Sequence, residues 1–293
     1  MSLPSVDDAR AWIAARSARA IAIRVVAVVT VLALAGGLAF YAYFGVFAHH
    51  APEEVRESVR ADGNVTVTEA YGGFVVSDAD PEVERLGVVF YPGGRVAPDA
   101  YLPTAGAIAE RANATVVVPK MRVNLAVFSI GRADAVLAGE RNVSQWVVGG
   151  HSLGGAMACR YAGGHPDAVD GLLLVGAYCD QPVRETPALA VVGTRDSVLD
   201  REQFADSRGN LPADATVERI EGMNHSQAGR YGGQSGDRPA RIGTDAAHRR
   251  LAAVVADWLC GEFDHCAAGA TPDGPATATS AVDAGSAPLG PDR

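Results

Sequence analysis

The chain has 293 residues, of which 48% are hydrophobic and only 6% are aromatic. A chain of this length can form one globular domain whose core needs no metal or cross-link to stabilise it. The formal net charge is -9, and Lys120 is the only lysine among the 25 basic residues. Because a surface that follows a phosphate backbone must be basic, this balance excludes nucleic acid as a partner.

The N-terminal region contains a long apolar run. Residues 25–48 carry no charged side chain, and as an α-helix they would be about 36 Å long, more than the hydrocarbon core of a bilayer. Arginines precede the run and aromatic residues lie at its far end. The positive-inside rule therefore predicts a cytoplasmic stub at 1–24, a transmembrane signal anchor at 25–48, and an extracytoplasmic location for the rest. Cleavage of a signal peptide after Ala48 is the alternative, although the run is longer than a usual signal core.

The chain after the anchor divides into a domain and a tail. Residues 53–266 are expected to form the folded domain. Residues 267–293 consist mainly of Ala, Gly, Pro, Thr, Ser and Asp, with almost nothing large to bury. This composition predicts a disordered tail.

Four cysteines follow the anchor, in what would be an oxidising compartment. Cys260 and Cys266 lie close together at the end of the last predicted helix, and we expect them to pair. Cys159 and Cys179 lie inside apolar stretches. For these two, the sequence leaves open either a second disulfide or buried free thiols.

Strand and helix patterns alternate through the middle of the chain. Short apolar runs bounded by Gly, Pro or Asp predict buried strands at 86–91, 115–118, 145–149, 172–175, 189–192 and 216–220. Helical spacing occurs at 99–112, 132–138, 153–162, 199–207 and 245–258. This order predicts an α/β fold, with a mainly parallel sheet flanked by helices. An antiparallel hairpin at 65–76 is expected to lead into the sheet, and the link before the fifth of these strands is too short for a helical lid.

One motif joins the third of these strands to the following helix. Gly150-His151-Ser152-Leu153-Gly154 fits the G-x-S-x-G pattern of a nucleophile elbow, in which a serine occupies a strained turn between strand and helix. The Leu153 amide would then face the substrate oxygen at a helix N-terminus. The His151 side chain is expected to point away from the substrate. The alternative is an ordinary glycine-rich link with a capping serine.

A serine nucleophile needs a base, and the base needs an acid that fixes its tautomer. Asp196 follows the strand at 189–192, and His225 follows the strand at 216–220, in the order Ser, Asp, His. We therefore predict Asp196 as the acid and His225 as the base. Asp200 is the competing acid.

A second oxyanion donor is expected from the loop after the strand at 86–91. That loop contains Gly93 and Gly94, which allow the backbone to approach a substrate closely, and it continues into Arg95. The sequence leaves open whether the backbone amide of Gly94 or of Arg95 is the donor.

Several motifs together resemble the α/β-hydrolase superfamily, and more narrowly a lidless prokaryotic family within it. The resemblance covers about residues 86–259 and rests on YPGG (91–94), AYLP (100–103), NLAVF (124–128), GGHSLGGAMACRYA (149–162), GTRD (193–196) and NHSQAGRYGGQSGD (224–237). It implies Ser152 as nucleophile, Asp196 as acid and His225 as base. Tyr231, Gln234 and Asp237 in the last motif either shape the site or belong to a surface loop.

These features predict a serine hydrolase that cleaves an ester through an acyl-enzyme intermediate. No metal and no organic cofactor are expected. The expected partners are a small ester or acyl substrate and a lipid bilayer contacted through 25–48. The alternatives are an acyltransferase of the cell envelope with the same triad, or a non-catalytic binding protein with this fold.

Overall fold

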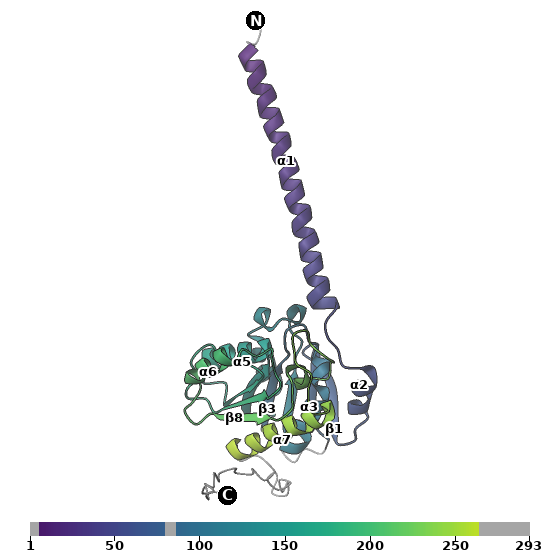
Figure 1. Ribbon diagram of the computed structural model, residues 1–293, viewed down its shortest axis with the longest axis vertical. Helices are drawn as coiled ribbons and strands as arrows, with labels where there is room; N and C mark the ends of the chain where they lie inside the picture. Colours follow the sequence, from purple (N-terminus) through teal and green to yellow (C-terminus); the bar gives the residue numbers. More distant parts are fainter. Residues whose placement is uncertain (1–5, 80–85, 264–293) are drawn as a thin grey trace, which may run out of the picture.

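The computed structural model describes residues 6–79 and 86–263 (Figure 1). The predicted tail at 267–293 and Cys266 lie outside the described residues. The domain limits predicted at 53–266 therefore stay a prediction.

The N-terminal apolar run is one long helix that stands away from the domain (Figure 1). Helix α1 spans Val6–Tyr41 and continues as a π-helical turn, η1, over Ala42–Val46. The segment Arg19–Val46 is long and apolar enough to cross a membrane, and none of its most apolar stretch is buried. The helix ends two residues before the predicted boundary at Ala48, and it begins within the predicted stub.

The domain is built on one eight-stranded sheet with the strand order β1-β2-β4-β3-β5-β6-β7-β8. The strands are β1 Val65–Ala70, β2 Gly73–Asp78, β3 Leu86–Tyr91, β4 Thr115–Val118, β5 Gln145–His151, β6 Gly171–Val175, β7 Ala188–Gly193 and β8 Thr216–Ile220. Strand β2 pairs antiparallel with β1 and β4, and the other pairs are parallel. This confirms the mainly parallel sheet and the leading hairpin.

The hairpin turn follows from its two central residues. Tyr71 and Gly72 both have positive φ, of 54° and 69°. Two such residues between antiparallel strands give the backbone twist that a tight hairpin requires. Phe74 on β2 then pairs with Val118 of β4, which places the hairpin at the edge of the parallel strands.

Helices cover both faces of the sheet (Figure 1). They are α2 Glu53–Arg60, α3 Leu102–Ala112, α4 Arg132–Gly139, α5 Leu153–Gly164, α6 Arg201–Ser207 and α7 Thr244–Phe263. The buried side chains of α3 and α7 belong to one core cluster, and those of α4, α5 and α6 belong to the cluster on the other face. Helix α2 is polar and was not predicted.

The fold has no large lid within the described residues. The segment 176–187 between β6 and β7 contains turns and no helix, as its length predicts. The predicted site residues follow the carboxyl ends of β3, β5, β7 and β8.

Candidate active site

Ser152 occupies a strained turn between β5 and α5. Its φ of 53° and ψ of -125° are rare for a residue with a side chain. The turn is tight enough that a Cβ on Gly154 would lie 2.1 Å from the carbonyl oxygen of Tyr91, so only glycine fits at that position. Strand, strained serine and helix together have the geometry of a nucleophile elbow.

Two backbone amides lie near this turn and are free to bind an anion. Leu153 is the first residue of α5, so its amide has no acceptor within the helix. A Cβ on Gly94 would lie 3.5 Å from Leu153 Cδ2, which makes the two residues neighbours. The Arg95 amide instead donates to the carbonyl of Asn124 over 2.8 Å. Of the two donors that the sequence leaves open, the geometry thus favours Gly94 and not Arg95.

Asp196 and His225 form a buried pair. His225 Nδ1 lies 2.8 Å from Asp196 Oδ2, and both side chains are 1% exposed. Asp196 Oδ1 accepts the amides of Val198 and Leu199 over 3.0 and 2.9 Å, which fixes the carboxylate in place. A carboxylate accepts only, so the proton of the neutral imidazole is on Nδ1. His225 Nε2 is buried and has no hydrogen-bond partner among the described residues, and it is the nitrogen left to accept a proton.

Asp200 has a different role from Asp196. It is the N-cap of α6, and its Oδ1 accepts the amides of Glu202 and Gln203, each over 3.0 Å. These bonds satisfy two amides that have no partner within the helix. The structure therefore pairs His225 with Asp196, and Asp200 serves the helix.

Ser152 and His225 line the same cavity, which has a volume of about 270 Å³. The other lining residues come from α5, from the segment after β6 and from the segment around α6: Leu153, Ala156, Gly176, Ala177, Tyr178, Val198, Leu199, Asp200 and Gln203. Gly176 has a φ of 53°, and a Cβ there would lie 3.1 Å from both Asp196 Oδ2 and His225 Nδ1. Gly176 cannot be identified from the sequence, because its constraint comes from Asp196 and His225, which only the fold brings together.

His151 is buried directly beside His225, a contact that the sequence does not reveal. The centroids of the His151 and His225 rings are 4.4 Å apart. Burial, together with the nearby His225, lowers the pKa of His151 well below its usual value, so its ring is neutral. Its Nδ1 lies 3.0 Å from the hydroxyl of Tyr101, and that hydroxyl also accepts the amide of Gly93 over 2.9 Å.

This arrangement joins the loop after β3 to the elbow. Burial raises the pKa of Tyr101, so the hydroxyl keeps its proton. Because its oxygen accepts the Gly93 amide, the assignment that satisfies the hydroxyl has it donate to His151 Nδ1. The same oxygen accepts the Gly93 amide, one residue before the proposed oxyanion donor Gly94. We call the chain Gly93–Tyr101–His151 the tyrosine bridge. The motif AYLP at 100–103 was the signal in the sequence that could have located it.

The glycine-rich loop after His225 supports the turns that carry Asp196 and His225. Asp237 accepts the amide of Ser226, the residue after His225, over 3.0 Å, and the amide of Ser197, the residue after Asp196, over 3.4 Å. Tyr231 donates its hydroxyl to Gln234 within the loop. Asp237 therefore joins the two turns that carry the pair, whereas the bond between Tyr231 and Gln234 stabilises the loop itself.

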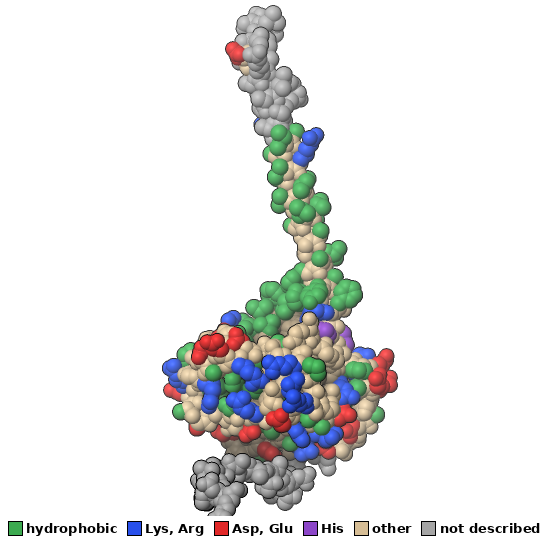
Figure 2. Space-filling view, viewed as in Figure 1, with side chains coloured by type: hydrophobic (Ala, Val, Ile, Leu, Met, Phe, Trp, Pro, Cys, Tyr) green, Lys and Arg blue, Asp and Glu red, His purple; other side chains and the backbone are tan. Residues whose placement is uncertain are grey.

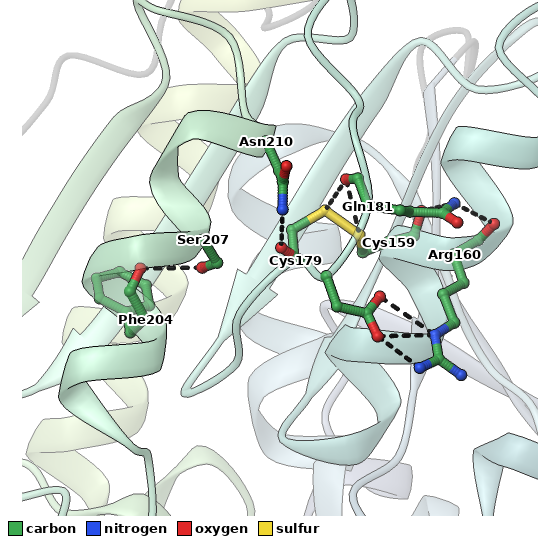
Figure 3. The surroundings of a disulfide bond; sticks show 8 residues. Cys159, Arg160, Cys179, Gln181, Phe204, Ser207 and Asn210 are labelled. Atoms are coloured by element: carbon green, nitrogen blue, oxygen red, sulfur yellow. Dashed lines mark hydrogen bonds and ion pairs between the residues drawn. A yellow bond between two sulfur atoms is a disulfide. The ribbon is translucent and has the colours of Figure 1, made fainter.

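Cys159 and Cys179 form a disulfide, which resolves the alternative left open by the sequence (Figure 3). The bond ties α5, which begins at the elbow, to the segment after β6 that lines the cavity. Gln181 and Arg160 reinforce it, since the Gln181 amide donates to the Arg160 carbonyl over 2.9 Å (Figure 3). Cys260 is also disulfide-bonded, and its expected partner Cys266 lies outside the described residues.

Residues 87–249 match the sequence model of a family described as the alpha/beta hydrolase family. No curated protein matches the sequence significantly.

Similar solved structures include an esterase domain from a Rhodothermus marinus protein, with 14% identity, a TM-score of 0.47, and coverage of 66% of this chain and 96% of that one. A predicted CIB-like hydrolase from Thermoplasma acidophilum has 14% identity and a TM-score of 0.48, over 67% of this chain and 97% of its own. A structure from work on LipS and LipT, two metagenome-derived lipolytic enzymes, has 16% identity and a TM-score of 0.42, and the match covers 49% of this chain and 86% of that one.

Proposed function

The chain belongs to the α/β-hydrolase family, and we propose that it is a serine hydrolase that cleaves carboxylic esters through Ser152, Asp196 and His225. One observation carries the proposal. The buried Asp196–His225 pair leaves Nε2 as the open nitrogen of the base, and His225 lines the same cavity as the serine of the strained elbow. A binding protein would have no need of an acid that fixes the tautomer of a histidine beside a strained serine.

The reaction begins with His225 Nε2 taking the proton of Ser152 Oγ while Oγ attacks the ester carbonyl carbon. The carbonyl oxygen becomes an oxyanion, which accepts hydrogen bonds from the amides of Leu153 and Gly94. Asp196 stabilises the imidazolium that forms. The C–O bond to the alcohol breaks, His225 protonates the departing alkoxide, and the acyl group stays on Ser152.

Water completes the cycle. His225 Nε2 takes a proton from a water molecule, whose oxygen attacks the acyl carbon, and the second oxyanion occupies the same pair of amides. When it collapses, Ser152 Oγ leaves and recovers its proton from His225. The products are one carboxylic acid and one alcohol, and the enzyme returns to its starting state.

The proposed location is a membrane, with residues 1–24 in the cytoplasm, 25–48 as the anchor and the domain from residue 53 outside. The exposed apolar segment Arg19–Val46 supports the anchor. The Cys159–Cys179 disulfide supports an oxidising compartment for the domain, because such bonds rarely persist in the cytosol. Proteolysis of intact spheroplasts tests this arrangement: external protease should digest the domain, and complete protection would refute the proposed sidedness.

A fluorophosphonate probe tests the nucleophile on the full chain in detergent. Wild type should be labelled and Ser152→Ala should not, because the probe phosphonylates only an activated serine. Ser207→Ala is the matched control, since Ser207 Oγ bonds the carbonyl of Phe204 on α6, outside the proposed machinery. Equal labelling of wild type and Ser152→Ala would refute the assignment. Product analysis with an added acceptor alcohol separates hydrolysis from acyl transfer, since transfer yields a new ester in place of the acid.

A further inference from the structure

Few large hydrophobic side chains of the domain are exposed. Among the described residues after Phe47, only three large hydrophobic residues are exposed: Val127 at 43%, Phe128 at 50% and Val198 at 37%. Val198 lines the active-site cavity. Val127 and Phe128 lie in the short helix η4, Ala126–Phe128, which is next to the end of the N-terminal helix. Figure 2 shows the hydrophobic surface of the helix continuing onto the top of the domain.

The end of the helix packs on this part of the domain. The ring centroids of Phe40 and Phe128 are 6.4 Å apart. Asn124 donates its side-chain amide to the carbonyl of Phe44 over 2.8 Å. The guanidinium of Arg95 lies 4.0 Å from the centre of the Tyr43 ring. The end of the helix and this part of the domain therefore form one continuous surface.

The chain that leaves the helix is fixed to the loop after β3. His49 donates its amide to Arg95 over 2.7 Å and accepts the amide of Ala97 over 2.8 Å. The buried carboxylate of Asp99 then receives the Ala51 amide over 3.2 Å and lies 2.8 Å from the ring of His50. We call these contacts between residues 47–51 and 95–99 the juxtamembrane clamp. They hold the orientation of the domain relative to the helix.

The depth that Phe128 would have in a bilayer can be estimated from the length of the helix between Arg24 and Phe40. Arg24 is the last charged residue before the apolar run. An α-helix rises about 24 Å from Arg24 to Phe40, which is less than the hydrocarbon thickness of about 30 Å. With Arg24 at the cytoplasmic boundary, Phe40 still lies among lipid chains, and tilting the helix only places it deeper. Phe128 lies beside Phe40 and so meets the bilayer as well.

The same surface continues to the nucleophile. Leu125 Cδ2 lies 3.7 Å, and Leu153 Cδ2 3.5 Å, from the position that a Cβ on Gly94 would occupy. Leu153 follows Ser152 and lines the cavity. Phe128 donates its amide to the carbonyl of Leu125 over 3.1 Å, so the exposed turn of η4 lies three residues from a side chain next to Leu153.

We propose that Val127 and Phe128 rest in the bilayer and that the substrate is an amphiphilic ester resident in that bilayer, not an ester dissolved in water. This inference rests on the proposed function, since the bond cleaved and the residues that cleave it are unchanged. The bilayer supplies the substrate laterally, with the acyl chain in lipid and the ester group at the level of the cavity.

The first test needs no catalysis. Phe128→Trp in the full chain is reconstituted into phosphatidylcholine vesicles whose acyl chains are brominated, and its emission is corrected for the native tryptophans. Bromine should quench the added tryptophan. Phe263→Trp at the end of α7 is the control and should not be quenched, because α7 lies at the side of the domain away from the helix (Figure 1). Equal emission of Phe128→Trp in brominated and ordinary vesicles would overturn the proposal.

The second test compares two esters in phosphatidylcholine vesicles, a soluble short-chain aryl ester and a long-chain ester dissolved in the bilayer. Val127→Ser/Phe128→Ser should lower turnover of the bilayer ester by roughly tenfold, the order expected when an aromatic side chain loses its apolar contact, and should retain turnover of the soluble ester. Val127→Leu/Phe128→Leu keeps the surface apolar and should retain both. Equal loss on both esters, or on neither, would overturn the inference. If neither ester is cleaved by wild type, the proposed function fails instead.

Discussion

Replacing Tyr101 by Phe tests the tyrosine bridge, because it removes one oxygen atom and leaves the ring in place. The hydroxyl is buried and accepts the Gly93 amide while donating to His151 Nδ1. Its loss leaves one donor and one acceptor buried without partners, at a cost of about 1–3 kcal/mol each. We therefore expect the free energy of unfolding to fall by roughly 2–6 kcal/mol.

The catalytic effect of Tyr101→Phe should come through Gly94. Loss of one oxyanion donor lowers kcat by about two to three orders of magnitude, and a loosened donor should lower it by less, roughly tenfold, with little change in KM. Urea unfolding followed by circular dichroism measures the stability, and hydrolysis of a soluble ester measures kcat and KM. Wild-type values for both stability and kcat would refute the bridge.

Tyr91→Phe is the matched control for the bridge. The Tyr91 hydroxyl is also buried and also joins two backbone groups, since it donates to the Ile130 carbonyl over 2.6 Å and accepts the Ala133 amide over 2.9 Å. Its removal should lower stability by a similar amount and leave kcat within about threefold, because these partners lie towards α4 and not in the oxyanion loop. If Tyr91→Phe lowered kcat as much as Tyr101→Phe does, the loss of kcat in both variants would come from destabilisation of the whole domain and not from the tyrosine bridge.

Three further predictions concern the acid, a buried histidine and the disulfide. Asp196→Asn should lower kcat by about 10³- to 10⁴-fold, whereas Asp200→Asn keeps the helix cap and should retain activity; similar kcat losses in the two variants would contradict the assignment of the acid. Burial lowers the pKa of His248 from 6.5 to about 4, so the unfolded chain binds more protons between those pH values and stability should fall by about 3 kcal/mol as pH drops from 6.5 to 4. In urea titrations, the free energy of unfolding of His248→Gln should lack this fall between pH 6.5 and 4. If the variant showed the same pH dependence as wild type, His248 would not be its cause. Replacing Cys159 and Cys179 together by Ala should cost about 3 kcal/mol for a loop closed over 20 residues, measured by thermal unfolding beside oxidised wild type; equal stability of the two proteins would count against the bond.

The sequence predicts the sheet well because its strands are short apolar runs with sharp limits. Strands β3, β4 and β8 begin and end at the predicted residues. Helix α2 escapes prediction because it is short, polar and only partly covered. The N-terminal helix ends before the predicted boundary because residues from Phe47 onward bond to the loop at Arg95, a partner that local hydropathy cannot reveal.

The order of the site residues is predictable for a related reason. Turns that follow parallel strands meet at one edge of the sheet, so Asp196 and His225 could be placed together from their positions after β7 and β8. The choice of Gly94 over Arg95 could not be predicted, because it depends on the Arg95 amide bonding to Asn124. The pairing of Cys159 with Cys179 could not be predicted either. The two residues are 20 positions apart in the sequence, and only the fold brings their Cα atoms to within 5.4 Å.

The juxtamembrane clamp also sets how far the domain can move from the proposed anchor. If residues 47–52 were a flexible linker, the domain could move over roughly 13 Å relative to the helix. The hydrogen bonds of His49 and Ala51 to the loop after β3 prevent that movement. A domain that is fixed to its helix in this way cannot reach a neighbouring membrane. In a mixture of vesicles with and without the enzyme, turnover should therefore stop once the esters of the enzyme-bearing vesicles are exhausted, and the ester in the others should persist for as long as the vesicles do not fuse.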